Sequence, residues 1–303
     1  MLPKVCVLCA VYNGEEYLHE QLTSILKQKE VELDIFLSVD KSTDSSLNIL
    51  KGFERGNSNI IILPYGETYG SAGQNFFRLF RDVDFEDYDY ISLSDQDDIW
   101  LPDKLITSIS EMKKNSSNAY SGNVMAFWEN GKTKLIKKNA PQVSYDHLFE
   151  SSGPGCSFVL DKQLSIAIKN NLIENSLGSK KLWMHDWFIY SFARTQGYKW
   201  YIGARPLMLY RQHDANVVGA SSGMAARILR AKVILSNSAF TKVIEQANYL
   251  DLKAKPIELI KSGKKSDLVK LAFYGHKCRR KANEKLLFSF AILAILVKRV
   301  ING

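Results

Sequence analysis

Cysteine is scarce in this sequence: only four of the 303 residues are cysteines, at positions 6, 9, 156 and 278. Small secreted domains that depend on disulfide bonds use many more, so this scarcity excludes that class and favours a reducing compartment. The close pair, Cys6 and Cys9, does not indicate a metal or redox site. An odd spacing within a strand directs the two thiols to opposite faces of the sheet.

Membrane-spanning segments and leader sequences are not expected either. The apolar run LLFSFAILAILV, residues 286–297, has 12 residues, whereas a spanning helix needs about 20. The stretch MLPKVCVLCAVYN at the start turns polar too soon for a secretory signal peptide. No internal repeat or low-complexity tract is apparent. These features predict a cytoplasmic globular protein whose contact with a membrane, if any, is peripheral.

Charge is distributed unevenly along the chain. Residues 224–303 contain 17 Lys and Arg against 5 Asp and Glu, whereas residues 1–223 contain 23 against 27. A basic region of this kind attracts phosphate, either of nucleic acid or of an anionic membrane. The region has no nucleic-acid-binding motif and no interleaved aromatic platform. We therefore expect no nucleic acid as a partner.

The basic region predicts a role at a surface. Residues 224–255 have the pattern of an amphipathic helix with a cationic face. Near the end, HKCRRKANEK precedes the short apolar run and KR follows it, which suits an anchor at the interface of an anionic inner membrane. The alternative is that these helices pack against the rest of the chain or against a second subunit, as in a homodimer.

Strand and helix patterns alternate through the first hundred residues. Short apolar runs predict four strands. One begins at Lys4, and the others cover Asp34–Val39, Asn59–Leu63 and Tyr88–Leu93. Helical spacing separates them over Glu15–Gln28, around residues 47–50 and over residues 71–80. This alternation predicts an α/β fold with a mainly parallel central sheet flanked by helices. Later strands are expected over residues 119–127, 155–160 and 200–209, with a helix over residues 182–192.

Three polar segments each follow one of the early strands: AVYNG, VDKSTDSS and SDQDDIW. Because ligands of parallel sheets bind beyond the carboxyl ends of the strands, these segments predict one shared site. Asp95, Asp97 and Asp98 suit Mg²⁺ or Mn²⁺, which typically bridges one or two carboxylates to the phosphates of a ligand. The alternative is a solvated acidic turn that caps a helix beginning near Pro102.

Three further residues suggest chemistry. Asp186 lies between His185 and Trp187 among apolar neighbours, and such surroundings raise the pKa of a carboxylate toward the range of a general base. The alternative is that Asp186 caps the helix that begins there. His213 offers an imidazole, a good ligand for Mn²⁺, although a lone histidine is more often structural. Arg211 would pair well with a diphosphate.

The segments AVYNGEEYLHEQLTSILKQ, VDKSTDSS, SDQDDIW, MHDW and YRQHDANVVGA together resemble the family 2 glycosyltransferases of the GT-A fold. Within that family the likeness is to bacterial rhamnosyltransferases of cell-surface polysaccharide or O-antigen synthesis, and it covers roughly residues 3–220. It implies a catalytic domain over residues 1–220, with a nucleotide-binding half (about 1–100) and an acceptor half (about 101–220). Residues 221–303 would form a basic helical region.

The resemblance also implies roles for particular residues. Asp40 would hydrogen-bond the base and Asp95 the ribose, while Asp97 and His213 would hold Mn²⁺ or Mg²⁺ on the diphosphate. Asp186 would be the catalytic base. The complete set of residues implied for the nucleotide-sugar is Ala10, Tyr12, Asn13, Glu16, Asp40, Asn75, Asp95, Gln96 and Arg211. The acceptor is expected near Trp100, His185 and Trp187.

The implied reaction is inverting, metal-dependent transfer of L-rhamnose from dTDP-β-L-rhamnose to a lipid-linked glycan. One departure from the family pattern concerns the second segment. It reads Asp40-Lys41-Ser42-Thr43 where the family commonly has two acids followed by glycine and serine. The altered segment leaves two alternatives: a transferase that uses a UDP-hexose, or a sugar- or nucleotide-binding module without turnover.

Overall fold

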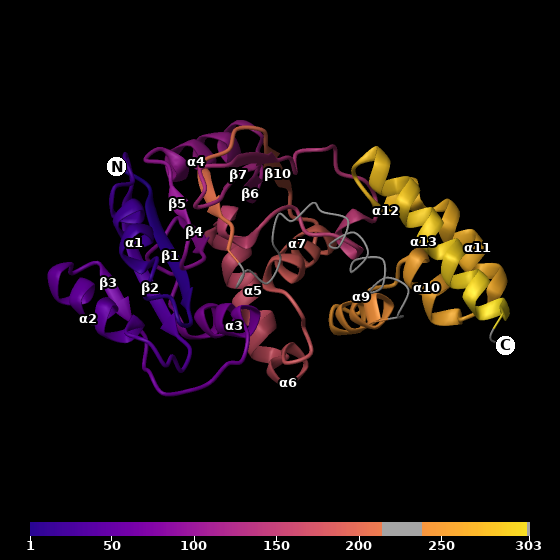
Figure 1. Ribbon diagram of the computed structural model, residues 1–303, viewed down its shortest axis with the longest axis horizontal. Helices are drawn as coiled ribbons and strands as arrows, with labels where there is room; N and C mark the ends of the chain where they lie inside the picture. Colours follow the sequence, from indigo (N-terminus) through magenta and orange to yellow (C-terminus); the bar gives the residue numbers. More distant parts are fainter. Residues whose placement is uncertain (214–237, 302–303) are drawn as a thin grey trace. The chain divides into compact units, whose positions relative to one another are not determined.

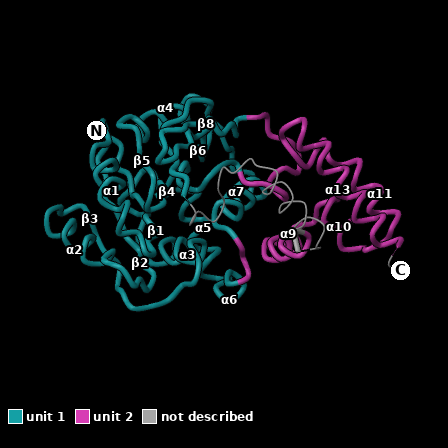
Figure 2. Tube along the Cα trace, viewed as in Figure 1, with its two compact units in different colours: residues 1–139, 152–180, 184–219 teal, residues 140–151, 181–183, 220–303 magenta. Residues whose placement is uncertain are grey.

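The computed structural model describes residues 1–213 and 238–301 (Figure 1). The chain divides into two compact units, which Figure 2 distinguishes by colour. Unit 1 consists of residues 1–139, 152–180 and 184–219, and unit 2 of residues 140–151, 181–183 and 220–303. Of the amphipathic helix predicted over residues 224–255, residues 224–237 lie outside the described residues.

The main sheet of unit 1 has seven strands in the order β10-β6-β9-β4-β1-β2-β3. Strands β3, β2, β1 and β4 run parallel to one another, so their carboxyl ends lie at one edge, whereas β9 runs antiparallel between β4 and β6. The bounds are β1 Lys4–Val11, β2 Glu32–Val39, β3 Ile60–Ile62, β4 Tyr90–Ser94, β6 Ala119–Gly122, β9 Val159–Asp161 and β10 Trp200–Gly203.

Helices cover this sheet on both faces (Figure 1). The core under one face joins alternate residues of β1, such as Val7 and Val11, to Leu22 of α1, Leu50 of α2 and Leu105 of α4. On the other side α3 packs against β1 and β2 and contacts α5 and α7. The bounds are α1 Leu18–Leu26, α2 Ser46–Gly56, α3 Ala72–Asp82, α4 Lys104–Lys114, α5 Lys162–Glu174, α6 Ser176–Ser179 and α7 His185–Thr195.

Local sequence signals explain where several of these helices begin. The Ser71 hydroxyl accepts a hydrogen bond from the Gln74 N–H at 3.2 Å, which caps α3. The Asp161 carboxylate accepts one from the Leu164 N–H at 2.8 Å at the start of α5. Each cap supplies an acceptor to an N–H group that has no partner within the helix.

Two segments predicted as single strands are each broken in two. Residues 119–127 form β6 and β7 (Val124–Phe127), and residues 200–209 lie in β10 and β11 (Met208–Arg211). The second members of both pairs belong to a four-stranded sheet, β5-β11-β7-β8, with β5 at Ile99–Trp100 and β8 at Thr133–Ile136. Asn123 holds the break: its side chain donates to the Ala204 carbonyl at 2.8 Å and accepts from the Lys138 N–H at 2.6 Å.

The strand predicted over residues 155–160 is also shorter than expected. Residues Gly155–Ser157 form a 3₁₀ turn, η2, and only Val159–Asp161 pairs as a strand. A side chain at Gly155 would collide with the imidazole of His185, so the turn brings its backbone directly against α7.

The four cysteines are buried free thiols.

Unit 2 is helical in its described part. Its elements are η1 Asp146–Leu148, α9 Ser238–Tyr249, α10 Lys255–Ser262, α11 Lys265–Phe273, α12 Gly275–Cys278 and α13 Ala282–Ile301. A buried ion pair joins Arg280 to Asp146 at 3.2 Å, and Arg280 also pairs with Glu150 at 3.3 Å. These contacts tie residues 140–151 to the C-terminal helices. Among the described residues, no helix is both long enough and apolar enough to cross a membrane.

Candidate functional site

The loops that follow β1 and β4 are fastened to each other by the amide of Gln96. The Tyr12 N–H donates to Gln96 Oε1 at 2.7 Å, and Gln96 Nε2 donates to the Tyr12 carbonyl at 2.9 Å. Gly14 makes this approach possible, because a Cβ at that position would lie 2.6 Å from Gln96 Oε1. The central residue of the Asp95-Gln96-Asp97 segment therefore fixes the position of the two carboxylates beside it.

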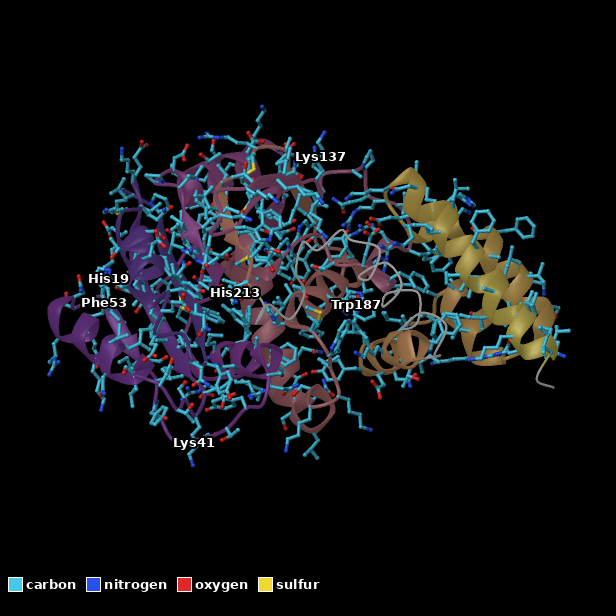
Figure 3. The ribbon with its side chains drawn as sticks, viewed as in Figure 1. His19, Lys41, Phe53, Lys137, Trp187 and His213 are labelled. Carbon is cyan, nitrogen blue, oxygen red and sulfur yellow. The ribbon has the colours of Figure 1, made fainter. Side chains whose placement is uncertain are left out.

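The loops after β1 and β2 are also joined by hydrogen bonds. The Asn13 N–H donates to the Ser42 hydroxyl at 3.0 Å, and Asn13 Oδ1 accepts from the Thr43 N–H at 2.8 Å. Asn13 takes a positive φ of 45°, which asparagine tolerates better than most residues. Ser42, one of the two departures from the family pattern, thus has a structural partner here. Lys41, the other, is exposed to solvent (Figure 3).

Asp40 and Asn75 are buried and bonded to the protein itself. The Asp40 carboxylate is 4% exposed and accepts N–H bonds from Tyr69 and Gly70, both at 2.9 Å. Asn75 is 2% exposed and donates to the carbonyl groups of Ser38 at 3.0 Å and Val11 at 3.3 Å. In this structure the two side chains brace the ends of β1 and β2 and the loop before α3.

The acidic segment after β4 concentrates negative charge. Burial, together with the neighbouring Asp97 carboxylate, raises the pKa of Asp95 to about 7. Burial, together with the Asp97 and Asp95 carboxylates, raises the pKa of Asp98 well above its usual range. One carboxylate oxygen of Asp95, one of Asp98 and the Cys156 sulfur lie within 4.8 Å of one another. Carboxylates this close disfavour joint ionisation, and a bound cation would relieve that repulsion.

Asp97 and His213 form a pair that could hold a divalent metal ion. Asp97 Oδ2 and His213 Nε2 are 2.7 Å apart, and their side chains are 13% and 17% exposed. A carboxylate and an imidazole that converge at a partly open position are a suitable donor set for Mn²⁺, whereas Mg²⁺ prefers oxygen ligands. The Cys156 thiol is less suitable, because burial and the adjacent carboxylates raise its pKa well above the usual range.

Arg211 is the last residue of β11 and is 8% exposed. Its Nε donates to the Asp97 carbonyl at 2.8 Å, and its guanidinium pairs with the carboxylate of Glu20 on α1. The ring of Tyr17, just before α1, contacts both Arg211 and His213. Tyr17 and Glu20 were missed from the sequence, where they look like ordinary residues of the helix after the first strand.

Asp186 lies in the first turn of α7 and is 8% exposed. The helix is capped at Met184, so Asp186 is not the N-cap residue, although its carboxylate accepts the Trp187 N–H at 2.7 Å. Asp186 is close enough to Asp95 for their carboxylates to repel. The structure therefore brings the expected base and the acidic segment into one site.

His185 is the first residue of α7 and packs against α3. Its ring is 6% exposed and stacks on Phe76 with the ring centroids 4.0 Å apart. Burial lowers the pKa of His185 to about 3, so the imidazole is neutral at physiological pH. Its Nε2 is buried without a hydrogen-bond partner and faces Gly155.

The tryptophan side chains at positions 100, 183 and 187 differ in their exposure to solvent. Trp100 is 2% exposed and Trp187, labelled in Figure 3, is 8% exposed, whereas Trp183 is 47% exposed. Trp183 belongs to unit 2, where the Lys242 ammonium lies 3.4 Å from its ring centroid.

Of the residues expected at the nucleotide, Tyr12, Asn13 and Glu16 are exposed to solvent. Ala10 is buried, with 8% of its surface exposed.

Comparison with known proteins places these features in a family context. The model of the glycosyl transferase family 2 matches residues 6–173. A protein of Shigella flexneri named dTDP-rhamnosyl transferase RfbG is 42% identical over 278 residues, 91% of this chain and 96% of the relative. The UDP-Glc:alpha-D-GlcNAc-diphosphoundecaprenol beta-1,3-glucosyltransferase WfgD of Escherichia coli is 30% identical over 162 residues, 53% of this chain and 61% of the relative.

Solved structures share the fold at low sequence identity. S. aureus TarS 1–349 in complex with UDP-GlcNAc aligns with a TM-score of 0.57 at 13% identity, covering 97% of this chain and 88% of that one. Mannosyltransferase PcManGT from Pyrobaculum calidifontis, in complex with GDP-Man and Mn²⁺, aligns with a TM-score of 0.51 at 15% identity, covering 100% and 88%. The predicted α/β fold of the GT-A type is confirmed.

Proposed function

Because the chain belongs to glycosyl transferase family 2 and is a glycosyltransferase, we propose that it transfers L-rhamnose from dTDP-β-L-rhamnose to a hydroxyl group of a glycan. The observation that carries this proposal is the 42% identity, over nearly the full length of both chains, to a protein named dTDP-rhamnosyl transferase.

We assign the proton transfer to Asp186. The acceptor hydroxyl oxygen forms a bond to the anomeric carbon as the bond from that carbon to the diphosphate oxygen breaks, and the hydroxyl proton passes to the Asp186 carboxylate. A single displacement of this kind inverts the anomeric carbon, so a β-linked donor gives an α-linked product. The position of Asp186 close to Asp95, and its place at the N-terminal turn of α7, support this role.

Asp97 and His213 would hold Mn²⁺ or Mg²⁺, which supplies positive charge to the departing diphosphate. Asp95 would bond the ribose, and Tyr12, Asn13 and Glu16 would line the exposed side of the nucleoside pocket. Asp40 reaches a base only if it exchanges one of its N–H partners from Tyr69 or Gly70 for the base. Asn75 and Gln96 would act through the loops that they brace.

His185 and Trp187 flank Asp186 in the chain and are buried, so they would hold Asp186 in position. Trp100, which is 2% exposed, would support the acidic segment Asp95–Asp98.

We further propose that the acceptor is lipid-linked and that α13 places the enzyme at the cytoplasmic face of an anionic membrane. Phe290 is 66% exposed in the middle of an apolar row on α13, and Lys298 and Arg299 follow in its last turn. An apolar face beside cations is the pattern of an interfacial helix. The exposed apolar residues of α13 are Leu286, Leu287, Phe290, Leu293, Val297, Val300 and Ile301.

Vesicle flotation tests the membrane proposal. The protein is expected to float with vesicles that contain anionic lipid at low salt, less with neutral vesicles, and not when Leu287 and Phe290 are both changed to Glu. Asn283→Glu, an exposed change on the same helix, is the matched control and should still float. Equal flotation of the double variant would overturn the role of α13, and a dimer in solution that the double variant abolishes would favour a second subunit.

A donor-binding panel tests the choice of sugar nucleotide. Titration calorimetry with dTDP-rhamnose, dTDP-glucose and UDP-glucose, each with Mn²⁺, should give the tightest binding for dTDP-rhamnose. The UDP-hexose alternative rests on the partial likeness to the E. coli protein named a UDP-Glc glucosyltransferase, WfgD. Tighter binding of UDP-glucose would establish that alternative in place of ours.

A further inference from the structure

We propose that Arg211 does not contact the donor. Instead, it positions the metal-binding pair, Asp97 and His213, by fastening the acidic loop, Asp95–Asp98, to β11 and α1. This inference rests on the proposed function, since it assumes that Asp97 and His213 share a metal ion. It reassigns Arg211 from the diphosphate, and it gives Asp98 a role that the sequence left open.

The guanidinium of Arg211 contacts two aromatic rings. Its central carbon lies 4.6 Å from the ring centroid of Tyr17 and 4.6 Å from that of Phe127. Tyr17 precedes α1 and Phe127 ends β7, so the arginine contacts two elements besides its own strand. Two aromatic contacts of this kind restrict the orientation of a planar cation.

Hydrogen bonds from Arg211 reach two successive residues of the acidic loop. The side-chain Nε donates to the Asp97 carbonyl at 2.8 Å, and the backbone N–H donates to Asp98 Oδ1 at 3.0 Å. Asp98 is fully buried, so its carboxylate serves as an internal anchor and not as a surface ligand. Arg211 therefore fixes both the backbone of Asp97 and the carboxylate that follows it.

His213 is placed by the same group of residues. Two residues beyond Arg211, its ring lies 5.1 Å from the ring of Tyr17, centroid to centroid, and its Nε2 meets Asp97 Oδ2 at 2.7 Å. The acidic loop and the histidine thus have a common frame built from Arg211 and Tyr17. Residues that orient metal ligands in this way commonly change metal affinity by about 10–100-fold when they are altered.

Contact with a diphosphate is the competing role for Arg211, and the geometry disfavours it. The side chain is 10% exposed, and its charge is already paired with the carboxylate of Glu20. A phosphate would have to displace Glu20 and approach a guanidinium that already contacts two aromatic rings. The Glu20 side chain is 55% exposed, so a substitution at position 20 does not place a charged or polar group in the interior.

Binding measurements on Arg211→Met, Arg211→Lys and Glu20→Gln distinguish the two roles. Mn²⁺ affinity is measured by electron paramagnetic resonance in the presence of dTDP, and dTDP affinity is measured separately without metal. Arg211→Met is expected to weaken Mn²⁺ binding about 10–100-fold and to change metal-free dTDP affinity less than about twofold. Arg211→Lys should not restore Mn²⁺ affinity, because an ammonium group lacks the planar fork that reaches Asp97 and Glu20 together.

Matched controls and the contrary results complete the test. Arg55→Met and Glu174→Gln, both at exposed helical positions, should leave both affinities unchanged. If Arg211→Met does not fold, Glu20→Gln carries the test, with a smaller loss of Mn²⁺ affinity expected. Loss of metal-free dTDP binding with unchanged Mn²⁺ affinity, and its rescue by Arg211→Lys, would overturn the inference. A wild-type protein that binds no Mn²⁺ would instead overturn the proposed metal site.

Discussion

Asp97 Oδ2 and His213 Nε2 lie 2.7 Å apart although 116 positions separate them in the chain. The contact joins the loop after β4 to the end of β11, which belongs to the second sheet. It is the point at which the two sheets of unit 1 contribute to one site. A carboxylate and an imidazole at this distance can share either a proton or a metal ion.

Asp97→Asn is expected to lower metal-dependent transfer by about 10²-fold or more, because a neutral amide holds a divalent cation poorly and the departing diphosphate loses stabilising charge. The measurement is kcat/KM as a function of Mn²⁺ concentration. Asp87→Asn, an exposed change before β4, is the control and should behave like the wild type. Unchanged Mn²⁺ dependence in Asp97→Asn would remove this residue from the metal site.

Asp186→Asn should reduce transfer by about 10²–10⁴-fold, the usual contribution of a general base, while dTDP binding stays nearly unchanged. Single-turnover kinetics with saturating donor separates the chemical step from binding. The backbone contact to the Trp187 N–H can be kept by the amide oxygen of the new side chain, so the fold of α7 should persist. Retained turnover would rule out Asp186 as the base.

The first part of the fold was predictable because its signals are local. Each apolar run of β1, β2 and β4 ends in polar residues, and parallel pairing then places those ends together. The breaks within residues 119–127 and 200–209 were missed, although Gly122-Asn123 in the first and Gly203 and Pro206 in the second are residue types that commonly interrupt strands. Asn123 decides the first break through its contacts with Ala204 and Lys138, which are distant in sequence.

The sequence also did not reveal which of two similar side chains is buried or which neighbour it contacts. Asp97 and Asp98 are adjacent and chemically identical, yet one faces His213 and the other anchors β11. Likewise the pattern LWMHDW does not reveal that Trp183 is exposed while Trp187 is buried. These differences depend on which elements cover each side chain, and that information lies in tertiary packing.

Gly155→Ala should destabilise the protein by about 1–3 kcal/mol, the usual cost of inserting a methyl group into a packed interior. The new methyl group would collide with the His185 imidazole, which is confined against Phe76. The measurement is the free energy of unfolding in urea. Gly52→Ala in α2 is the matched control: nothing lies within 4 Å of its added Cβ, and helix propensity predicts a gain of up to about 1 kcal/mol. Equal effects of the two changes would contradict this account of η2 and α7.

The most direct test of the proposed function is the structure of the product formed from dTDP-β-L-rhamnose and a lipid-linked glycan acceptor with Mn²⁺. Nuclear magnetic resonance of the purified product reports both the transferred sugar and its anomeric configuration. We predict an α-linked L-rhamnosyl residue that appears with the wild type and not with Asp186→Asn. A β-linked rhamnoside, or transfer only from a UDP-hexose across a panel of lipid-linked acceptors, would contradict inverting rhamnosyl transfer by this enzyme.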